Sequence, residues 1–357
     1  MNDLLRLCRN GIKPVVAILS SLILGAIILF VAGYNVPEAF RALYSATFRN
    51  LFAFTITINR SSPLIFVGLA VAIAFRGSVF NIGAEGQLLM GAVFAAFVGI
   101  GFPGLPGFAL IPLMILGGAI GGALWGYIPG LLKAKFEVSE VITTIMFNYI
   151  ALNCIGALVR GPIKDRAQAE PQSFTIARQA FIPSLLPGTR LHFGFMLGAL
   201  LAIVLYLVLF KTRIGFELRA VGLNRDAARC GGIDVKRTII VTMALSGALA
   251  GVGGAIELGD IHYLIEGISP GYGYTGISVA VLASSNPLGV IFSSLLFGAL
   301  SSGASTMQRM AGVSASFVGI FQGIMIVAIA LASVAQTRPF KLKESPSDDG
   351  KRRRASA

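Results

Sequence analysis

The chain has 357 residues, of which 55% are hydrophobic and only 13% are charged, and its mean hydropathy is +0.80. A globular domain carries roughly 25% charged residues, so this chain has too little charge to cover a water-facing surface, and we expect lipid to cover it. The net charge of +13 would suggest nucleic acid in a soluble protein. Here the positive residues fall between apolar stretches, where membrane topology explains them and no nucleic-acid partner is expected.

Apolar runs, taken in chain order, predict an all-α polytopic membrane protein of about ten transmembrane helices. A plain helix needs about 20 residues to cross a bilayer. Clear spans lie at 12–32, 109–131, 140–159, 193–210, 238–256 and 314–334, and weaker ones at 63–75, 86–101, 275–284 and 288–303. The runs 63–75 and 275–284 are too short to cross alone, so we expect them to be broken helices surrounded by protein. The run 12–32 is longer than the core of a cleaved signal peptide, about 7–15 residues, and is interpreted as a retained anchor.

Glycine is frequent, at 43 residues, and recurs at helix-packing spacings. The run from Gly117 to Gly126 contains overlapping GxxxG spacings, and Gly247 and Gly251 supply another. Small residues let membrane helices approach closely. We therefore interpret these glycines as packing seams between helices and not as binding sites.

The lysine and arginine counts orient the predicted spans. With the N-terminus inside, cytoplasmic segments hold 20 of these residues and the outside holds nine, although five of the nine lie in the 160–192 loop. Cytoplasmic loops are enriched in positive charge. We therefore expect both termini and the 211–237 loop in the cytoplasm and the 160–192 loop outside. The transmembrane domain would cover 1–337, followed by a basic, disordered cytoplasmic tail at 338–357.

Two similar segments within the chain indicate two related helix breaks in the membrane region. The segment 68–73 (GLAVAI) resembles 276–281 (GISVAV), and polar breaks follow at Asn81-Ile82-Gly83 and at Asn286-Pro287. Interrupted apolar segments at matching places in two halves point to a transport site. Chance similarity between glycine-rich membrane segments is the alternative.

The 211–237 loop is predicted to contain a short helix from Arg225 to Cys230. Asn224 is a good N-cap, Asp226 suits the positive end of the helix dipole, and the glycines that follow allow a left-handed stop. Arginines that merely anchor a loop to lipid headgroups are the alternative. A capped helix between two spans is more structure than a tether needs, so a docking role becomes plausible.

Four motifs resemble one transporter family. They are 219–224 (RAVGLN) with the alanines and glycine that follow it, 80–87 (FNIGAEGQ), 140–149 (EVITTIMFNY) and 160–162 (RGP). Together they resemble the permease subunits of bacterial ABC importers for branched-chain amino acids, ribose-type sugars and nucleosides, with the nucleoside branch the most similar. The resemblance covers roughly 60–335.

The resemblance implies a complex in a bacterial cell membrane, the inner membrane in a Gram-negative cell. Two permease subunits, the second a related but different chain, would join cytoplasmic ABC ATPases and an external solute-binding protein. The short cytoplasmic helix, within about 219–233, would sit in a cleft of the ATPase. The implied coupling residues are Arg219, Gly222, Asn224, Ala227, Ala228, Gly231 and Gly232. A bulky charge at Ala228 should then block docking without disturbing the membrane core.

Motifs for chemistry within this chain are missing from the sequence. There is no Walker A pattern, so ATP would be used by the partner subunit and no cofactor is expected on this chain. The GxGxxG at 271–276 follows no strand, and no acidic residue occurs between Glu266 and Glu344, so we discount it. The three cysteines are scattered and form no metal-ligand pattern. We predict a transport subunit and not an enzyme.

Polar residues inside the predicted spans are candidates for the solute route. Glu140, Thr144 and Asn148 recur at i, i+4 and i+8, on one helix face. The remaining candidates lie at the two breaks: Asn81, Glu85, Gln87 and Asn286. Their donors and acceptors suit a neutral, hydroxyl-rich solute such as a nucleoside. Hydrogen bonding between helices, with no solute contact, is the alternative for any single residue.

Other functions remain as alternatives. The same importer type could carry a sugar or a branched-chain amino acid. An ion-coupled secondary transporter would carry intramembrane carboxylates or histidines, and Glu85 is the candidate for that role. A membrane enzyme is disfavoured because no nucleophile and base pair or metal cluster is recognisable.

Overall fold

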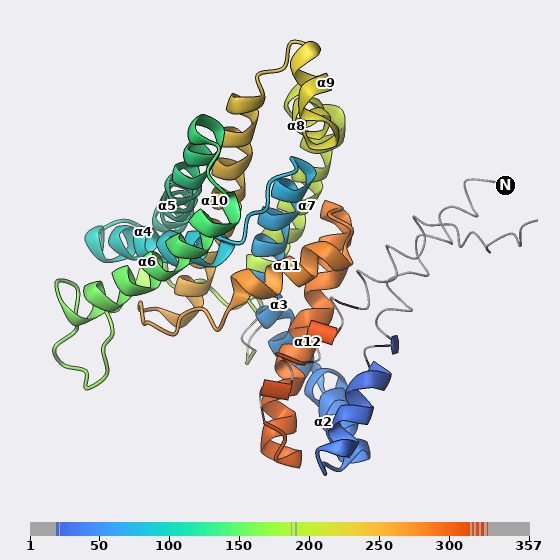
Figure 1. Ribbon diagram of the computed structural model, residues 1–357. Coiled ribbons are helices and arrows are strands. Elements are labelled where there is room, and N and C mark those ends of the chain that lie inside the picture. Colours follow the sequence, from blue (N-terminus) through green and yellow to red (C-terminus); the bar gives the residue numbers. More distant parts are fainter. Residues whose placement is uncertain are drawn as a thin grey trace, which may run out of the picture.

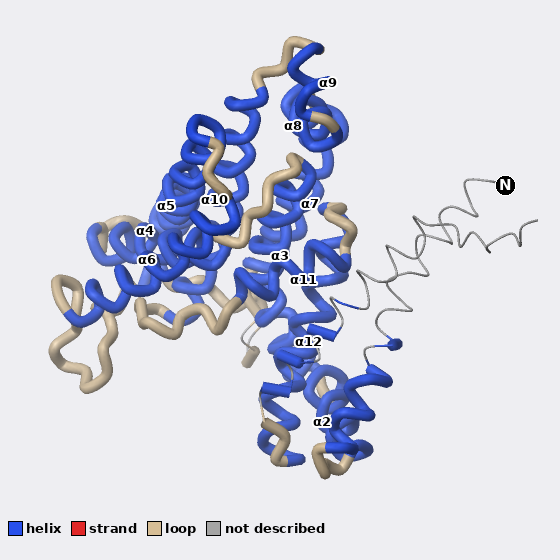
Figure 2. Tube along the Cα trace, in the orientation of Figure 1, coloured by secondary structure: helices blue, strands red, loops and turns tan. Residues whose placement is uncertain are grey.

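The chain is a bundle of helices in the part that the structure describes. The computed structural model describes residues 19–327 with gaps at 21, 187, 190, 315, 318, 321–322 and 325–326. Figure 2 shows helices joined by loops in this part, and the extended pairing there is limited to isolated β-bridges. The predicted all-α class is confirmed. The predicted tail 338–357, most of the span 314–334 and the start of the span 12–32 lie outside the described residues.

Eleven α-helices and one 3₁₀ turn carry labels in this region. They are α2 (Val36–Phe48), α3 (Leu51–Arg76), α4 (Ala84–Gly101), α5 (Gly107–Phe136), α6 (Glu140–Arg160), η1 (Arg178–Ala180), α7 (Gly194–Lys211), α8 (Arg213–Leu223), α9 (Arg225–Cys230), α10 (Val235–Ile261), α11 (Tyr272–Leu282) and α12 (Pro287–Ala311). Seven of them, α3 to α7, α10 and α12, are long and apolar enough to cross a membrane. The helix Leu22–Val31 and α11 are shorter apolar helices.

The first predicted broken helix is in fact part of a full-length one. We expected a short run at 63–75, but α3 has 26 residues and begins after Asn50, whose side chain accepts a bond of 2.8 Å from the amide of Ala53. The polar residues before Pro63 continue the helix because their hydroxyls bond back to its own carbonyls, as Ser61 does to Thr57 at 2.8 Å. Arg60, one of the nine lysines and arginines that the predicted orientation places outside, therefore lies within a span.

The second predicted broken helix is confirmed as short. α11 has 11 residues and packs against α3. The two similar segments contact each other there: a β-carbon on Gly68 would strike Val279, and one on Gly276 would strike Val67. Both glycines are therefore needed for close packing, as is typical of small residues between membrane helices.

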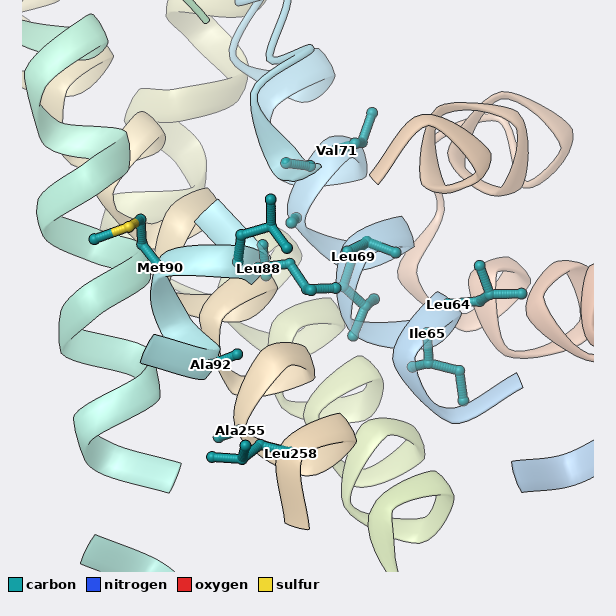
Figure 3. Packing of buried hydrophobic residues seen from close by; sticks show 14 of the residues in the cluster. Leu64, Ile65, Leu69, Val71, Leu88, Met90, Ala92, Ala255 and Leu258 are labelled. Carbon is teal, nitrogen blue, oxygen red and sulfur yellow. The ribbon is translucent and has the colours of Figure 1, made fainter. Parts of the chain in front are cut away.

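The core forms around α3, α4 and α10. Every residue of α3 from Ser61 to Ala74 is buried, and Figure 3 shows side chains of the three helices meeting in one apolar cluster. The predicted glycine seams join α5 to α10: Gly122 faces the carbonyl of Gly247, and Gly118 faces that of Gly251, with no room for a β-carbon. The interpretation of these glycines as packing residues is confirmed.

The two long polar loops lie at opposite ends of α10. The helices α8 and α9 lead into its N-terminus, at the top of Figure 1. The loop between α6 and α7 is bonded to its C-terminal end, where the amide of Ile182 donates to the carbonyl of Gly259 at 3.2 Å and that of Ile176 donates to His262 at 2.9 Å. This separation is what the predicted orientation requires. Which end faces the cytoplasm stays a prediction.

Candidate functional site

The predicted short helix of the 211–237 loop is present, and it is capped as expected. α9 runs from Arg225 to Cys230, and the side chain of Asn224 accepts bonds of 3.0 Å from the amides of Asp226 and Ala227. The sequence reasoning missed α8, which fills most of the remaining loop. Its signal was the cap Thr212, whose hydroxyl oxygen accepts from the amide of Gly215. The loop is therefore a helical hairpin.

The end of α9 is a Schellman motif. The amide of Ile233 donates to the carbonyl of Ala228, and the amide of Gly232 donates to that of Arg229, both at 3.0 Å. Gly232 has φ +81° and needs the left-handed region that glycine tolerates. Gly231 has φ −77°, so the expectation of a left-handed stop holds at Gly232 and is wrong at Gly231.

Three of the predicted coupling residues contact other parts of this chain. Arg219 lies over the ring of Phe210, and a β-carbon on Gly222 would strike the carbonyl of Arg76. Ala228 is 5% exposed and packs in a cluster with Val79 and Met243. The expectation that a charge at Ala228 would leave the core undisturbed is therefore wrong: the residue attaches α9 to α10 and to the link after α3.

A different set of residues forms the outward surface of the hairpin. Leu223 is 89% exposed, an unusual position for a leucine outside lipid, and Asp226, Ala227, Arg229 and Cys230 are exposed beside it. Asn224, Gly231 and Gly232 are exposed as well. A cavity of about 480 Å³ lies next to this surface, between α8 and the start of α10. We call the exposed residues 223–232 the α9 surface.

The link between α3 and α4, residues 77–83, carries a network of buried side-chain amides. The side-chain amide of Asn81 donates to Gln87 Oε1 at 2.8 Å and to the hydroxyl of Ser246 at 2.7 Å, and Ser246 donates to the carbonyl of Ala70 at 2.5 Å. Asn81 Oδ1 accepts from the amide of Gly83 at 2.9 Å. These bonds join the link, α4, α10 and α3.

Asn148 extends this network to α6. Its Oδ1 accepts from the amide of Gly86 at 2.8 Å, and its Nδ2 donates to the carbonyl of Ile82 at 2.9 Å and to the hydroxyl of Tyr274 at 3.3 Å. Thr144, one turn earlier, donates to the carbonyl of Glu140 at 2.6 Å. We call Asn81, Gln87, Asn148 and Ser246 with their backbone partners the amide network.

Three other predicted route residues serve other elements. Glu85 caps the start of α11, because its Oε2 accepts a bond of 2.6 Å from the amide of Gly273. Glu140 pairs with Lys133 across the turn between α5 and α6, at 2.8 Å. Asn286 caps α12 by accepting from the amide of Leu288 at 3.1 Å, and it takes part in none of the bonds of the amide network.

Six of the seven predicted route residues are thus buried and bonded inside the bundle, and Asn286 is half-buried. Asn81, Glu85, Gln87, Glu140, Thr144 and Asn148 are each at most 8% exposed. Their partner Tyr274 is different, since it is 46% exposed on α11. Figure 1 shows α6, α11 and the link between α3 and α4 on one side of the molecule. Through its bond to Tyr274, the amide network is connected to a side chain that is partly exposed.

A second polar cluster was missed by the sequence reasoning. Its members share a position between α3, α10, α11 and α12, and most are half-buried. We call it the Arg60 cluster: Asn59, Arg60, Glu257, Asp260, Tyr272, Ser301 and Ser305. The predicted spans hid it, because Glu257 and Asp260 lie just beyond the run 238–256 and Arg60 lies before the run 63–75. The polar face of α3, with i, i+4 spacing, was the available signal.

Bonds of moderate length hold the Arg60 cluster together. Arg60 Nη1 donates to the carbonyl of Ser301 at 3.1 Å and to the hydroxyl of Ser305 at 3.2 Å. Asn59 Nδ2 donates to Asp260 Oδ2 at 3.2 Å, and Tyr272 donates to Glu257 Oε1 at 3.3 Å. The cluster therefore offers carboxylate, amide, phenol and guanidinium groups within one region.

Comparison with known proteins finds a matching family and several similar proteins. A family model described as the permease component of branched-chain amino acid transport systems matches residues 53–330. The guanosine ABC transporter permease protein NupP of Bacillus subtilis is 39% identical over 93% of this chain and 96% of its own length. The nucleoside ABC transporter permease protein NupB of Lactococcus lactis is 32% identical over 94% of each. The glucose ABC transporter permease protein TsgB13 of Haloferax volcanii is 34% identical over 88% of this chain and 85% of its own length.

Proposed function

Since this chain belongs to the permease family of branched-chain amino acid transport systems, we propose that it forms the membrane route of a nucleoside importer. It is the permease of an ABC importer, and the family resemblance seen in its motifs is confirmed. The observation that carries the choice of solute is the match to NupP and NupB along nearly the whole chain. The similarity to a glucose permease keeps a sugar as the second candidate.

Uptake by the purified importer tests the solute. The complex, reconstituted in liposomes with ATP inside, should take up labelled guanosine or adenosine, and unlabelled glucose or leucine should not compete. Uptake of glucose in place of nucleosides would move the chain to a sugar importer. Uptake that survives ATP depletion and stops with a proton uncoupler would indicate a secondary transporter.

We further propose the partners that such a permease needs: a cytoplasmic ABC ATPase, a second and different permease chain, and an external solute-binding protein. ATP would be bound by the ATPase and not by this chain, which has no Walker A pattern. Affinity purification of this chain from its native membrane should recover these subunits together. Recovery of this permease alone, as its own dimer with the ATPase, would contradict the heteromeric arrangement.

The α9 surface is proposed as the contact with the ATPase. Its exposed leucine and short capped helix, between the spans α7 and α10, would transmit a displacement to both. Ala227→Glu places a charge on this surface, so the bundle should keep its thermal midpoint while ATPase association and uptake are lost. Ala169→Glu, in the exposed loop at the opposite end of α10, is the matched control. Normal ATPase binding by Ala227→Glu would place the contact elsewhere.

The proposed orientation puts the α9 surface in the cytoplasm of a bacterial cell, with both termini on that side. Cys230 is exposed on this surface and can report on it directly. In a background with Cys8 and Cys154 replaced by serine, an impermeant thiol reagent should leave Cys230 unmodified in intact cells and label it after lysis. A cysteine introduced at the exposed Gln168 should show the reverse.

The amide network, together with Glu85, Glu140, Thr144 and Asn286, is proposed to border the solute route by fixing its two breaks in place. What supports this role is that the network and the cap on α11 lie directly behind the exposed Tyr274. Neutral hydroxyl and amide groups along that side suit an uncharged solute. In this proposal the buried residues hold the helices that line the route in place and do not themselves bind the solute.

A further inference from the structure

The Arg60 cluster lies inside the membrane-spanning part of the chain, where ionisable groups are costly. Arg60 is nine residues into α3, or about 13 Å along the helix axis from Leu51. Glu257 lies four residues before the end of α10. Charged side chains within spans are rare and are retained where they pair with one another or line a path. The question is which of these two roles the cluster has.

The charges of the cluster are held near one another but are not paired. Among the ion pairs of the described residues, none involves Arg60, Glu257 or Asp260. The guanidinium instead bonds serine oxygens of α12, and all of these bonds leave from Nη1. Glu257 and Asp260 are one turn apart on the same side of α10, where two carboxylates repel each other. Within the described residues, the carboxylates of the cluster are therefore not neutralised through a direct ion pair with its guanidinium.

Hydrogen-bonding capacity is left over in the cluster. Each carboxylate uses one oxygen in the bonds described above, and a carboxylate can accept about four. Within the described part of the chain, Oδ1 of Asn59 and Oγ of Ser62, one turn further along α3, are buried without a hydrogen-bond partner. Ser62 is fully buried, at 0% exposure. Unsatisfied buried groups of this kind cost free energy unless water or a ligand completes them.

The chemistry of the cluster selects a class of ligand. Two carboxylates and one guanidinium carry a net charge of −1 when ionised, which disfavours an anion. Adjacent hydroxyl groups on a neutral solute can donate to both carboxylates and accept from the arginine and the asparagine amide. A ribose ring presents such a pair of hydroxyls, whereas a leucine side chain presents none.

The cluster also lies where a solute would enter the proposed route. Tyr272 belongs to the cluster, and Tyr274, two residues later on α11, contacts the amide network. The loop between α6 and α7, which we predict to be outside the cell, is bonded to the same end of α10 as Asp260. The cluster thus precedes the amide network on a path from the outside.

From these observations we propose that Asn59, Arg60, Glu257 and Asp260 form a subsite that binds the vicinal hydroxyls of the solute at the outer end of the route. This inference rests on the proposed importer function and adds the residues that recognise the sugar part of a nucleoside. Tyr272 positions Glu257 through its phenol.

The test compares a ribonucleoside with its 2′,3′-dideoxy analogue in uptake by the complete reconstituted importer. The variants are Asp260→Asn and Glu257→Gln, which keep the shape of each side chain and remove its charge. Glu170→Gln, in the exposed loop between α6 and α7, is the matched control. We expect each subsite variant to lose about tenfold in uptake of the ribonucleoside and to leave uptake of the dideoxy analogue unchanged. The solute-binding protein is the same in every assay, so a changed ratio reports on the permease.

Two results would overturn the subsite. Equal loss for both solutes, with the complex intact by size-exclusion chromatography, would show that the cluster holds helices together. An unchanged ratio in both variants would show that the hydroxyls are recognised elsewhere. Failure of the unmodified importer to take up any nucleoside is a different outcome and rejects the proposed solute. The same variants are then compared in uptake of glucose and of 2,3-dideoxyglucose, which has no vicinal pair of hydroxyls, and the ratio of the two uptake rates again decides.

Discussion

The amide network and the Arg60 cluster both place polar side chains inside a bundle that lipid surrounds, yet they solve the problem differently. In the amide network, Asn148 is 3% exposed and its donors and acceptor are all bonded. In the Arg60 cluster four of the seven side chains are ionisable, the residues are half-buried, and an asparagine oxygen lacks a partner within the described residues. The hydrogen bonds of the amide network are complete within the chain, whereas the Arg60 cluster has acceptors left over that a ligand could use.

The difference shows why neutral and charged residues suit different tasks in a membrane. An amide can satisfy a backbone amide and a carbonyl at once, so it can fix a break in a helix without a charge to desolvate. A carboxylate or guanidinium is costly to bury and is retained where a pathway needs it. Loss of an amide should therefore damage the fold, and loss of a charge should damage transport.

The largest effect is expected for Asn148→Ala. It leaves the amide of Gly86 and the carbonyl of Ile82 buried without partners, at about 1–3 kcal/mol for each group. The thermal midpoint in detergent and the yield of assembled complex should both fall. Asn153→Ala is the matched control on the same helix, because that side chain is exposed and bonds only the carbonyl of Tyr149. An assembled Asn148→Ala complex of normal stability would make this residue part of the route and not of the frame.

The next largest effect is expected at Glu85, which stabilises the fold as the residues of the amide network do, although it is a carboxylate. Glu85→Ala removes the cap on the first turn of α11 and should cost about 1–3 kcal/mol. Glu85→Gln keeps an oxygen that can accept from the amide of Gly273, so it should recover most of the thermal midpoint and of the uptake. If Glu85→Gln transports no better than Glu85→Ala, the charge itself is required, as in an ion-coupled transporter.

A smaller change in stability is expected in the Arg60 cluster. Glu257→Gln can retain the contact with Tyr272 and removes a carboxylate that repels Asp260. The free energy of unfolding should stay within about 1 kcal/mol of that of the unmodified chain, while uptake falls. A loss of stability as large as that of Asn148→Ala would erase the contrast between the two regions.

The smallest effect is a dependence of stability on pH near the Arg60 cluster. His192, in the loop before α7, is 3% exposed, and its Nδ1 accepts from the amide of Gly194 at 3.0 Å. Burial lowers the pKa of His192, although the nearby Asp260 carboxylate opposes this shift. The unfolded chain then binds a proton more readily, so stability is full above about pH 6.5 and decreases as the pH falls below it.

Thermal midpoints at pH 7.5 and 6.0 measure this effect, which should be below about 1 kcal/mol. His192→Gln keeps an acceptor for Gly194 and should reduce the difference. The pKa of His262 is lowered by burial too, so a remainder is expected from that residue. A midpoint that rises on acidification would show that His192 is charged in the folded chain.

The sequence alone determined the membrane class, the helical fold and the short helix of the hairpin. Hydropathy is a local property, and so is capping: Asn224, Asp226 and Gly232 act on amides and carbonyls within a few residues of themselves. The glycine spacings likewise predicted the seam between α5 and α10, because close helix packing leaves a periodic mark in the sequence. The four sequence motifs also predicted the permease family.

What only the tertiary structure decided is which side of each helix meets which neighbour. Ala227 and Ala228 are adjacent and chemically identical, but Ala228 is buried in the cluster that includes Val79, and Ala227 is exposed. Asn59 and Asp260 are 201 residues apart in the chain, so no spacing in the sequence could join them. The polar start of α3 also resembled a loop in the sequence. Its hydroxyls are tolerated in a membrane span because they bond back to the helix and face the other helices, and only the structure shows these contacts. Contacts between distant segments set these outcomes, and local patterns do not record them.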